Sequence, residues 1–143
     1  MAIAFHDRVT IALANYVYTD GHIYGRLEEG PDFANIRHHS WVAFQVSEIG
    51  GIYDWRTVTA HGSIQVLTDG PSVSDAAQFR HALDLIRAVV PAVLSPRDPM
   101  PERVHPFRMY VAELTGREAK ANAVIHPRPS SLRAPPEAAS DDE

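Results

Sequence analysis

Residues 57–66 read TVTAHGSIQV, and they carry the clearest strand pattern in the chain. Apolar or small residues occupy every second position, namely Val58, Ala60, Gly62, Ile64 and Val66. Polar residues occupy the positions between them, namely Thr57, Thr59, His61, Ser63 and Gln65. Because successive side chains of a strand point to opposite faces, this period of two predicts a strand with one face in a core and the other polar.

The segment before this strand predicts a β-hairpin, a helical turn and a further strand. Apolar residues alternate over residues 8–18, and the Asp20-Gly21 pair suits a tight turn into a strand at residues 23–24. Residues 31–39 place apolar side chains at helical spacing, and residues 41–46 alternate again. We expect the glycine pair at residues 50–51 to end that strand before the central one begins.

The segment after the central strand predicts one long helix and a last strand. Apolar residues recur at three-and-four spacing over residues 72–90, which is typical of an amphipathic helix, and Pro91 ends the pattern. A proline-rich connection then leads to a strand at residues 107–114, closed by residues 115–117. Short antiparallel strands around a single late helix predict an all-β fold, a β-barrel of five or six antiparallel strands with helical decoration.

Length and composition limit the functions that the chain can have. Its 143 residues suffice for one domain, which we place at residues 1–119, and residues 120–143 are rich in Pro, Ala, Ser and acid and predict a flexible tail. The absence of cysteine excludes disulfides, thiolate metal sites and cysteine nucleophiles. A net charge of −5 argues against nucleic-acid binding. No long apolar run or secretory signal occurs, so we expect a cytoplasmic protein that is not in the membrane.

Several enzyme classes lack their motifs here. The sequence contains no Gly-x-Ser-x-Gly elbow, no GxGxxG and no GxxxxGK[ST]. Eight histidines are present, but none is spaced as in HExxH, so we expect no metal site. These observations leave hydrolase, kinase and metalloenzyme functions without support.

Four segments, taken together, resemble a known family. They are YVYTDGHIY at residues 16–24, GPDFANIRHHSWVAFQV at residues 30–46, WRTV at residues 55–58 with Gly62 following, and FRMYV at residues 107–111 with LTGR at residues 114–117. Their order and spacing are similar to those of the FMN-binding split barrels, the pyridoxamine 5'-phosphate oxidase-like family, which includes nitroimidazole-resistance reductases. The resemblance covers residues 9–117, and no single motif in it is specific.

The resemblance implies a split β-barrel that holds FMN and works as a homodimer, with the flavin site built from both subunits and a small molecule as substrate. Two features depart from the family. Only eight residues precede Val9, where the family usually places a helix and a first strand, and an absent strand would leave an open sheet edge. Asp32 also stands where the family usually has a lysine or arginine for the FMN phosphate.

Candidate cofactor-binding residues follow from what FMN requires: cations for its phosphate, an apolar slot for its ring and hydrogen bonds to its ring nitrogens. For the phosphate we consider Arg26, Arg37 and Arg56, and the resemblance favours Arg56 and Arg26. The full set of predicted cofactor residues is Arg26, Arg37, Trp55, Arg56, Thr57, Val58, Thr59 and His61. No catalytic residue is assigned, and each of these residues also has a structural interpretation, as a surface arginine, a strand threonine or a packed tryptophan.

Three functions remain open from the sequence. The first is an FMN-dependent oxidoreductase. The second is a split barrel that binds flavin or another ligand without turnover, which Asp32 and the short N-terminal segment favour. The third replaces FMN with haem or a deazaflavin, which related split barrels hold. Fold-level resemblance does not identify the substrate.

Overall fold

The computed structural model describes residues 1–5 and 8–120, which form one antiparallel sheet and two helices. The sheet contains seven strands, which are β1 (Ala2–Phe5), β2 (Arg8–Ile11), β3 (Tyr16–Thr19), β4 (His22–Leu27), β5 (Trp41–Gly51), β6 (Asp54–Val66) and β7 (His105–Ala119). The helices are α1 (Pro31–His38) and α2 (Val73–Arg87). The strand order is β2-β1-β5-β6-β7-β4-β3, and every pair is antiparallel.

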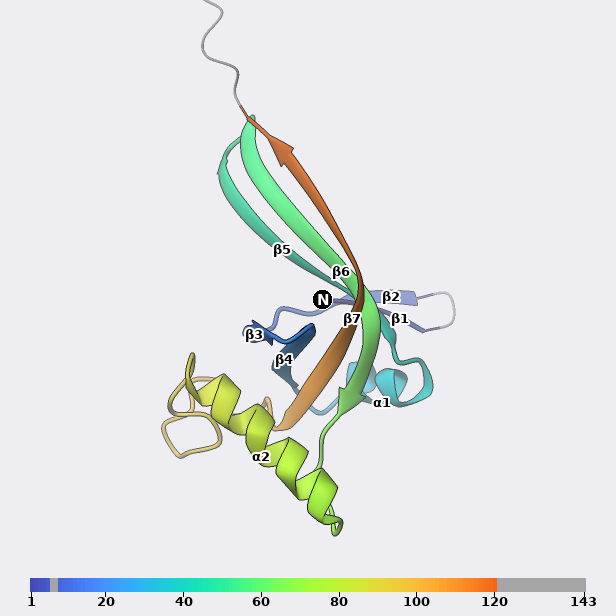
Figure 1. Ribbon diagram of the computed structural model, residues 1–143, viewed down its shortest axis with the longest axis vertical. Coiled ribbons are helices and arrows are strands. Elements are labelled where there is room, and N and C mark those ends of the chain that lie inside the picture. Colours follow the sequence, from blue (N-terminus) through green and yellow to red (C-terminus); the bar gives the residue numbers. More distant parts are fainter. Residues whose placement is uncertain (6–7, 121–143) are drawn as a thin grey trace, which may run out of the picture.

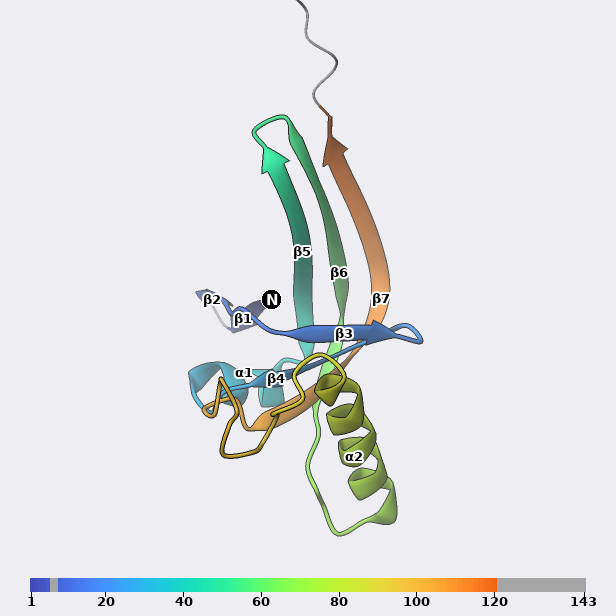
Figure 2. The ribbon, with the colours of Figure 1, turned by 90° about the vertical axis from the view of Figure 1, so that its left-hand side faces the viewer.

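The molecule has a curled base and a projecting arm (Figures 1 and 2). In the base, β1 to β4 and the lower halves of β5, β6 and β7 surround the main core, and α2 covers the outside of β4 and β7. The arm consists of the far ends of the three long strands, residues 46–51, 54–58 and 116–119, which pair with one another through β6. The arm therefore leaves much of its surface without cover from the same chain.

The main core fills the inside of the base, and the predicted central strand contributes one face to it. Ala60 and Ile64 of β6 are 3% and 4% exposed, and Phe107 and Met109 of β7 are fully buried beside them. Val58 was expected in the core but is 48% exposed, because its position on β6 lies in the arm. The alternation was correct, and the sheet curls over only part of the strand.

The second core lies between α2 and the outer face of the base. It contains Tyr24, Leu67, Ala82, Leu83, Ile86 and Val93. Ser72 caps the helix by accepting a hydrogen bond from the Asp75 backbone N–H at 3.0 Å. The helix predicted over residues 72–90 is confirmed, although it ends at Arg87 and turns continue to Val90.

Other strand limits differ from the prediction, and the strand count of five or six was too low. Residues 8–18 form two strands, β2 and β3, with residues 12–15 between them, and residues 2–5 form β1, so a strand does precede β2. β5 continues through the glycines at 50–51, and β7 continues through residues 115–117, because both pair with the 13-residue β6. Backbone hydrogen bonding to a long neighbour outweighs these local turn signals.

The hairpin at Asp20-Gly21 is as predicted. Both residues have positive φ, 49° and 74°, as a two-residue turn between antiparallel strands requires. In the part of the chain that the structure describes, no helix is long and apolar enough to cross a membrane.

Candidate functional site

A cavity of about 460 Å³ lies between β2, the end of β4 and the loop that precedes β7. We call it the β2–β4 cavity, and its lining residues are Thr10, Ile11, Ala12, Leu13, Arg26, Leu27, Glu28 and Arg103. Its volume lies within the range of small-molecule sites, roughly 300–1,000 Å³. The backbone of Ala12 is fixed by two hydrogen bonds with Met1, of 2.7 and 2.8 Å. One wall of the cavity is therefore tied to the N-terminal strand.

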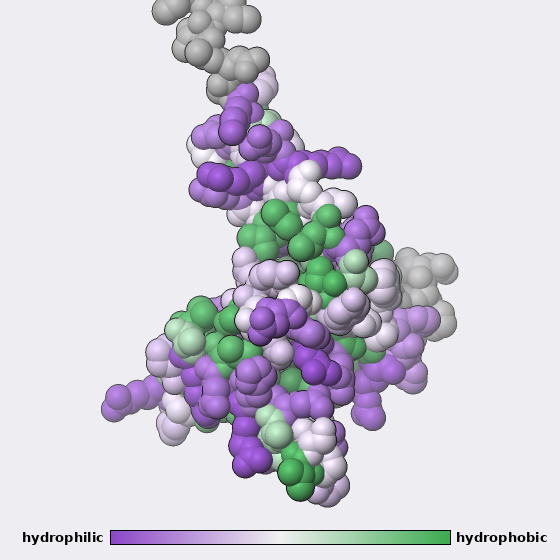
Figure 3. All heavy atoms as spheres, in the orientation of Figure 1, coloured by the Kyte–Doolittle hydropathy of each residue, from purple (hydrophilic) through white to green (hydrophobic). Residues whose placement is uncertain are grey.

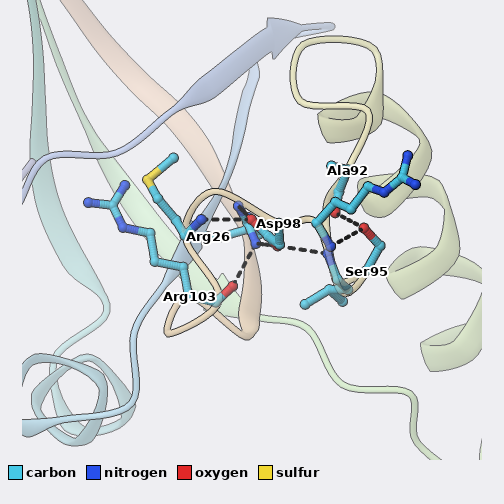
Figure 4. Close-up of polar contacts among 8 residues, drawn as sticks. Arg26, Ala92, Ser95, Asp98 and Arg103 are labelled. Carbon is cyan, nitrogen blue, oxygen red and sulfur yellow. Dashed lines mark hydrogen bonds and ion pairs between the residues drawn. The ribbon is translucent and has the colours of Figure 1, made fainter.

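Arg26, one of the lining residues, forms a buried ion pair with Asp98 (Figure 4). Arg26 is 4% exposed, and its guanidinium donates to both carboxylate oxygens of Asp98, at 2.6 and 3.1 Å. Nη1 of Arg26 also donates to the backbone carbonyl of Arg103 at 3.0 Å. The pairing is bidentate, which is the strongest form of an arginine–carboxylate contact.

Asp98 accepts two further hydrogen bonds, from the backbone N–H groups of Leu94 at 2.8 Å and Met100 at 3.0 Å. The hydrogen bonds from Arg26 hold the pKa of Asp98 well below its usual range, and they outweigh burial, which acts in the opposite direction. Asp98 is therefore ionised at neutral pH and neutralises Arg26. Both Nη groups of Arg26 donate hydrogen bonds within the protein.

Arg103 supplies a second guanidinium to the cavity. Its side chain is partly buried and makes no hydrogen bond or ion pair with any residue that the structure describes. Figure 4 shows this side chain directed away from Asp98. Glu28, an exposed acid, lines the same cavity and opposes part of its positive charge.

His105 lies two residues after Arg103, at the start of β7. In the strand register it lies opposite Leu27 of β4, and both Leu27 and Arg103 line the cavity. Its ring stacks on Phe33 of α1 with 4.1 Å between ring centroids. Its Nε2 is buried without a hydrogen-bond partner among residues 1–5 and 8–120. A buried polar atom of this kind indicates that a polar partner is missing from the neighbourhood.

The predicted site around Arg56 differs from the β2–β4 cavity in its exposure and in its charge. The Arg56 guanidinium is 70% exposed and pairs with Glu48 at 2.8 Å, at the end of the arm. The small cavity beside it, of about 170 Å³, is also lined by Asp54, Glu118 and Lys120. Three carboxylates and two cations surround this space, so its charge does not favour a phosphate dianion.

The eight predicted cofactor residues do not gather in one place within a single chain. In the strand register, Arg26 lies opposite Pro106 of β7, and Arg56 lies opposite Glu118 of β7. These two β7 positions are twelve residues apart, which is roughly 40 Å of strand. One phosphate therefore cannot contact both favoured arginines of the same chain.

The remaining predicted residues are also dispersed. Thr57, Thr59 and His61 project from the face of β6 opposite to Arg56 and Val58, as the alternation of a strand requires. Trp55 and Thr57 line a surface hollow on that opposite face of the arm. Arg37 is exposed on α1 and lines none of the cavities described here.

An apolar cavity of about 250 Å³ lies where the arm meets the base. Its lining is Tyr16, Tyr18, Ile23, Phe44, Val46, Val58, Ala60 and Leu114. The exposed fractions of Val46, Val58 and Leu114 are 37%, 48% and 52%. The sheet face that forms the core in the base is therefore exposed to solvent here. Figure 3 shows hydrophobic side chains on the arm between its hydrophilic tip and the base.

Sequence reasoning missed Asp98 and Arg103. Both lie in the proline-rich connection between α2 and β7, which has no periodic pattern. Asp98 is separated from Arg26 by 72 positions, so no local spacing links them. The one available signal was the expectation that a buried arginine needs a carboxylate partner, and it does not say which one.

Comparison with known proteins places the fold. The chain matches no protein-family profile and no curated protein. Among solved structures, it is similar to an FAD-binding protein from Mesorhizobium loti, with a TM-score of 0.64, 24% identity and 83% of each chain covered. It is also similar to a candidate 5-nitroimidazole antibiotic resistance protein from Bacteroides thetaiotaomicron, with a TM-score of 0.58, 19% identity, and 80% of this chain and 72% of the other covered.

A third similar structure is a candidate pyridoxamine 5'-phosphate oxidase from Corynebacterium glutamicum. Its TM-score is 0.51, its identity is 20%, and the match covers 83% of this chain and 77% of the other. These structures are the ones that the sequence resemblance implies. The split-barrel fold is thereby confirmed, and at these identities the likeness concerns the fold.

Proposed function

We propose that the protein binds a flavin nucleotide in the β2–β4 cavity and uses it in the oxidation or reduction of a small molecule. The observation that carries the proposal is the Arg103 guanidinium, which lines a ligand-sized cavity without a protein partner among the described residues. The Mesorhizobium loti protein, which has a similar fold, is an FAD-binding protein. The likeness in fold supports a flavin as the ligand, and the lining of the cavity supports this position for it.

The donor set of the cavity fits the phosphate end of a flavin nucleotide. Arg103 offers a guanidinium and Thr10 a hydroxyl. Charge-assisted hydrogen bonds of this kind contribute about 1.5–3 kcal/mol each. We take FMN as the cofactor, because a single unpaired guanidinium matches a single phosphate better than the pyrophosphate of FAD.

The apolar part of the lining fits a ring system. Ile11, Ala12, Leu13 and Leu27 present aliphatic surface from β2 and β4. A bound flavin supplies hydride or electron transfer, and the protein binds it, orients it and excludes water. The aliphatic side chains of this lining would hold the ring, and Arg103 would hold the charged end.

We also propose that the working form is a homodimer. The apolar surface at Val46, Val58 and Leu114 continues the core of the base and has no cover from the described part of the chain. A second copy related by a two-fold axis would bury it symmetrically. Light scattering at micromolar concentration should return twice the chain mass, and a monomer would contradict this part of the proposal.

A second candidate function is flavin binding without turnover. Glu28 in the cavity wall favours it, because an acid near the phosphate weakens binding, and the wall offers no histidine, tyrosine or lysine for proton transfer among the described residues. The two candidates differ in whether the bound flavin changes redox state. Absorbance at the flavin bands after addition of NADH or NADPH, followed by air, distinguishes them: bleaching and recovery support an oxidoreductase.

The proposal is tested by titrating FMN with the full chain and following flavin fluorescence. Saturable quenching that Arg103→Gln weakens supports the cavity as the site. Quenching that responds to Arg56→Ala and not to Arg103→Gln would instead support the site that the sequence suggested.

A further inference from the structure

The loop of residues 91–104 has no regular secondary structure, and Asp98 organises it. The Asp98 carboxylate accepts hydrogen bonds from backbone N–H groups on both sides of it, at Leu94 and Met100. Leu94 has a φ of 54°, which is unusual for a non-glycine residue and is held here by its own N–H contact with Asp98. Asp98 thus fixes the path of the loop from within.

Arg26 connects this loop to the sheet. It belongs to β4, where it pairs with Pro106 of β7, and its guanidinium contacts Asp98 and the carbonyl of Arg103. One side chain therefore holds the middle of the loop and the residue near its end. The result is that the backbone of Arg103 is fixed while its own guanidinium is left for the cavity.

Buried ion pairs contribute little net stability compared with apolar residues of the same size, because desolvation offsets most of their attraction. Their value can lie in geometry instead. Here the pair holds the backbone carbonyl of Arg103, and the Arg103 side chain that starts from this backbone lines the cavity. A side chain on a fixed backbone loses less freedom on binding than one on a mobile loop.

We infer that the Arg26–Asp98 pair is a positioning device for Arg103, and that Arg103 makes the cavity select phosphate-bearing flavins over neutral riboflavin. This inference rests on the proposed function, because it assigns the charged end of the same ligand. FMN and riboflavin share the ring and differ in the phosphate, so only FMN can gain from Arg103.

The test compares the dissociation constants of FMN and riboflavin for the full chain and four variants. For Arg103→Gln we expect FMN binding to weaken about tenfold or more and riboflavin binding to stay within about twofold, since one ligand loses a charge-assisted contact and the other has none to lose. Arg103→Lys should restore part of the FMN affinity. Arg97→Gln is the matched control, an exposed arginine of the same loop that does not line the cavity.

The positioning role is tested by the double variant Arg26→Met with Asp98→Leu, which replaces the pair with apolar residues of similar size and avoids leaving a buried charge. We expect it to keep a cooperative unfolding transition and riboflavin affinity while the preference for FMN falls. If Arg103→Gln keeps the wild-type ratio of the two constants, Arg103 does not select the phosphate. If the double variant keeps that ratio, the pair does not position Arg103. If wild-type protein binds neither flavin, the proposed function itself fails.

Discussion

Replacing Gly62 with alanine should damage the pairing of β6 with β7. A Cβ at this position would lie 1.8 Å from the Tyr110 carbonyl oxygen, 2.9 Å from the Tyr110 carbonyl carbon and 3.3 Å from the Ala112 nitrogen. All three are backbone atoms, so no side chain can move aside. The clash lies at the bulge where His61 pairs with Glu113, Gly62 pairs with Val111, and Ala112 has no partner.

The magnitude follows from the size of the overlap. Relieving it requires the two strands to separate by more than 1 Å at a buried position, roughly the overpacking that costs about 1–3 kcal/mol. Each neighbouring ladder hydrogen bond that is lost adds about 1 kcal/mol. With one such bond lost, we expect Gly62→Ala to lower the free energy of unfolding by about 2–4 kcal/mol, a large part of the stability of a domain this size.

The assay is urea unfolding followed by circular dichroism and tryptophan fluorescence, with Gly51→Ala as the control. A Cβ at Gly51 meets no atom within 4 Å, and its backbone φ is not positive, so this variant should stay within about 0.5 kcal/mol of wild type. If Gly62→Ala also remained within about 1 kcal/mol of wild type, the close approach of β7 would not be what requires glycine there.

Three other outcomes can be measured with the same preparations. Phe107→Ala empties a fully buried position in the main core and should lower the free energy of unfolding by about 3–5 kcal/mol in urea titrations; a loss below about 1 kcal/mol would be inconsistent with that packing. The Arg26–Asp98 pair lowers the pKa of Asp98, so the stability it contributes is present above the ordinary carboxyl value of 3.8 and is lost as pH falls further through the lowered value. Urea midpoints should therefore decline from about pH 4 downward in wild type, and Asp98→Asn should lack this component; parallel curves would refute it. Arg56→Ala removes only an exposed ion pair with Glu48, so we expect a stability change below about 1 kcal/mol and an FMN affinity within about twofold of wild type; a tenfold loss of affinity would return the phosphate to Arg56.

Local signals in the sequence predicted local structure correctly. The Asp20-Gly21 turn and the Ser72 cap each depend on a few neighbouring residues, and both are confirmed. The alternation of residues 57–66 also identified the correct core face. It did not say where along β6 the core stops, because that depends on how far the sheet curls over Val58.

Long-range pairing set the features that the sequence could not show. The lengths of β5 and β7 depend on the 13 residues of β6 between them, so a turn signal such as residues 115–117 is overruled from outside its own segment. Long-range contact also explains why the partner of Arg26 was not predicted. Arg26 was predicted as a phosphate contact at the end of a strand, and its partner Asp98, which comes from a loop with no periodicity, was not predicted. The contact with Asp98 gives Arg26 a structural role that the sequence did not predict.

Direct measurement of flavin binding by the full chain tests the central claim. Purified protein is stripped of ligand, titrated with FMN and followed by fluorescence quenching, with the bound flavin counted by absorbance. We expect saturable binding of one FMN per chain with a dissociation constant of about 10 μM or lower. Absence of quenching at concentrations of about 1 mM, where even weak sites of about 4 kcal/mol become half filled, would contradict the assignment of this split barrel as a flavin-binding protein.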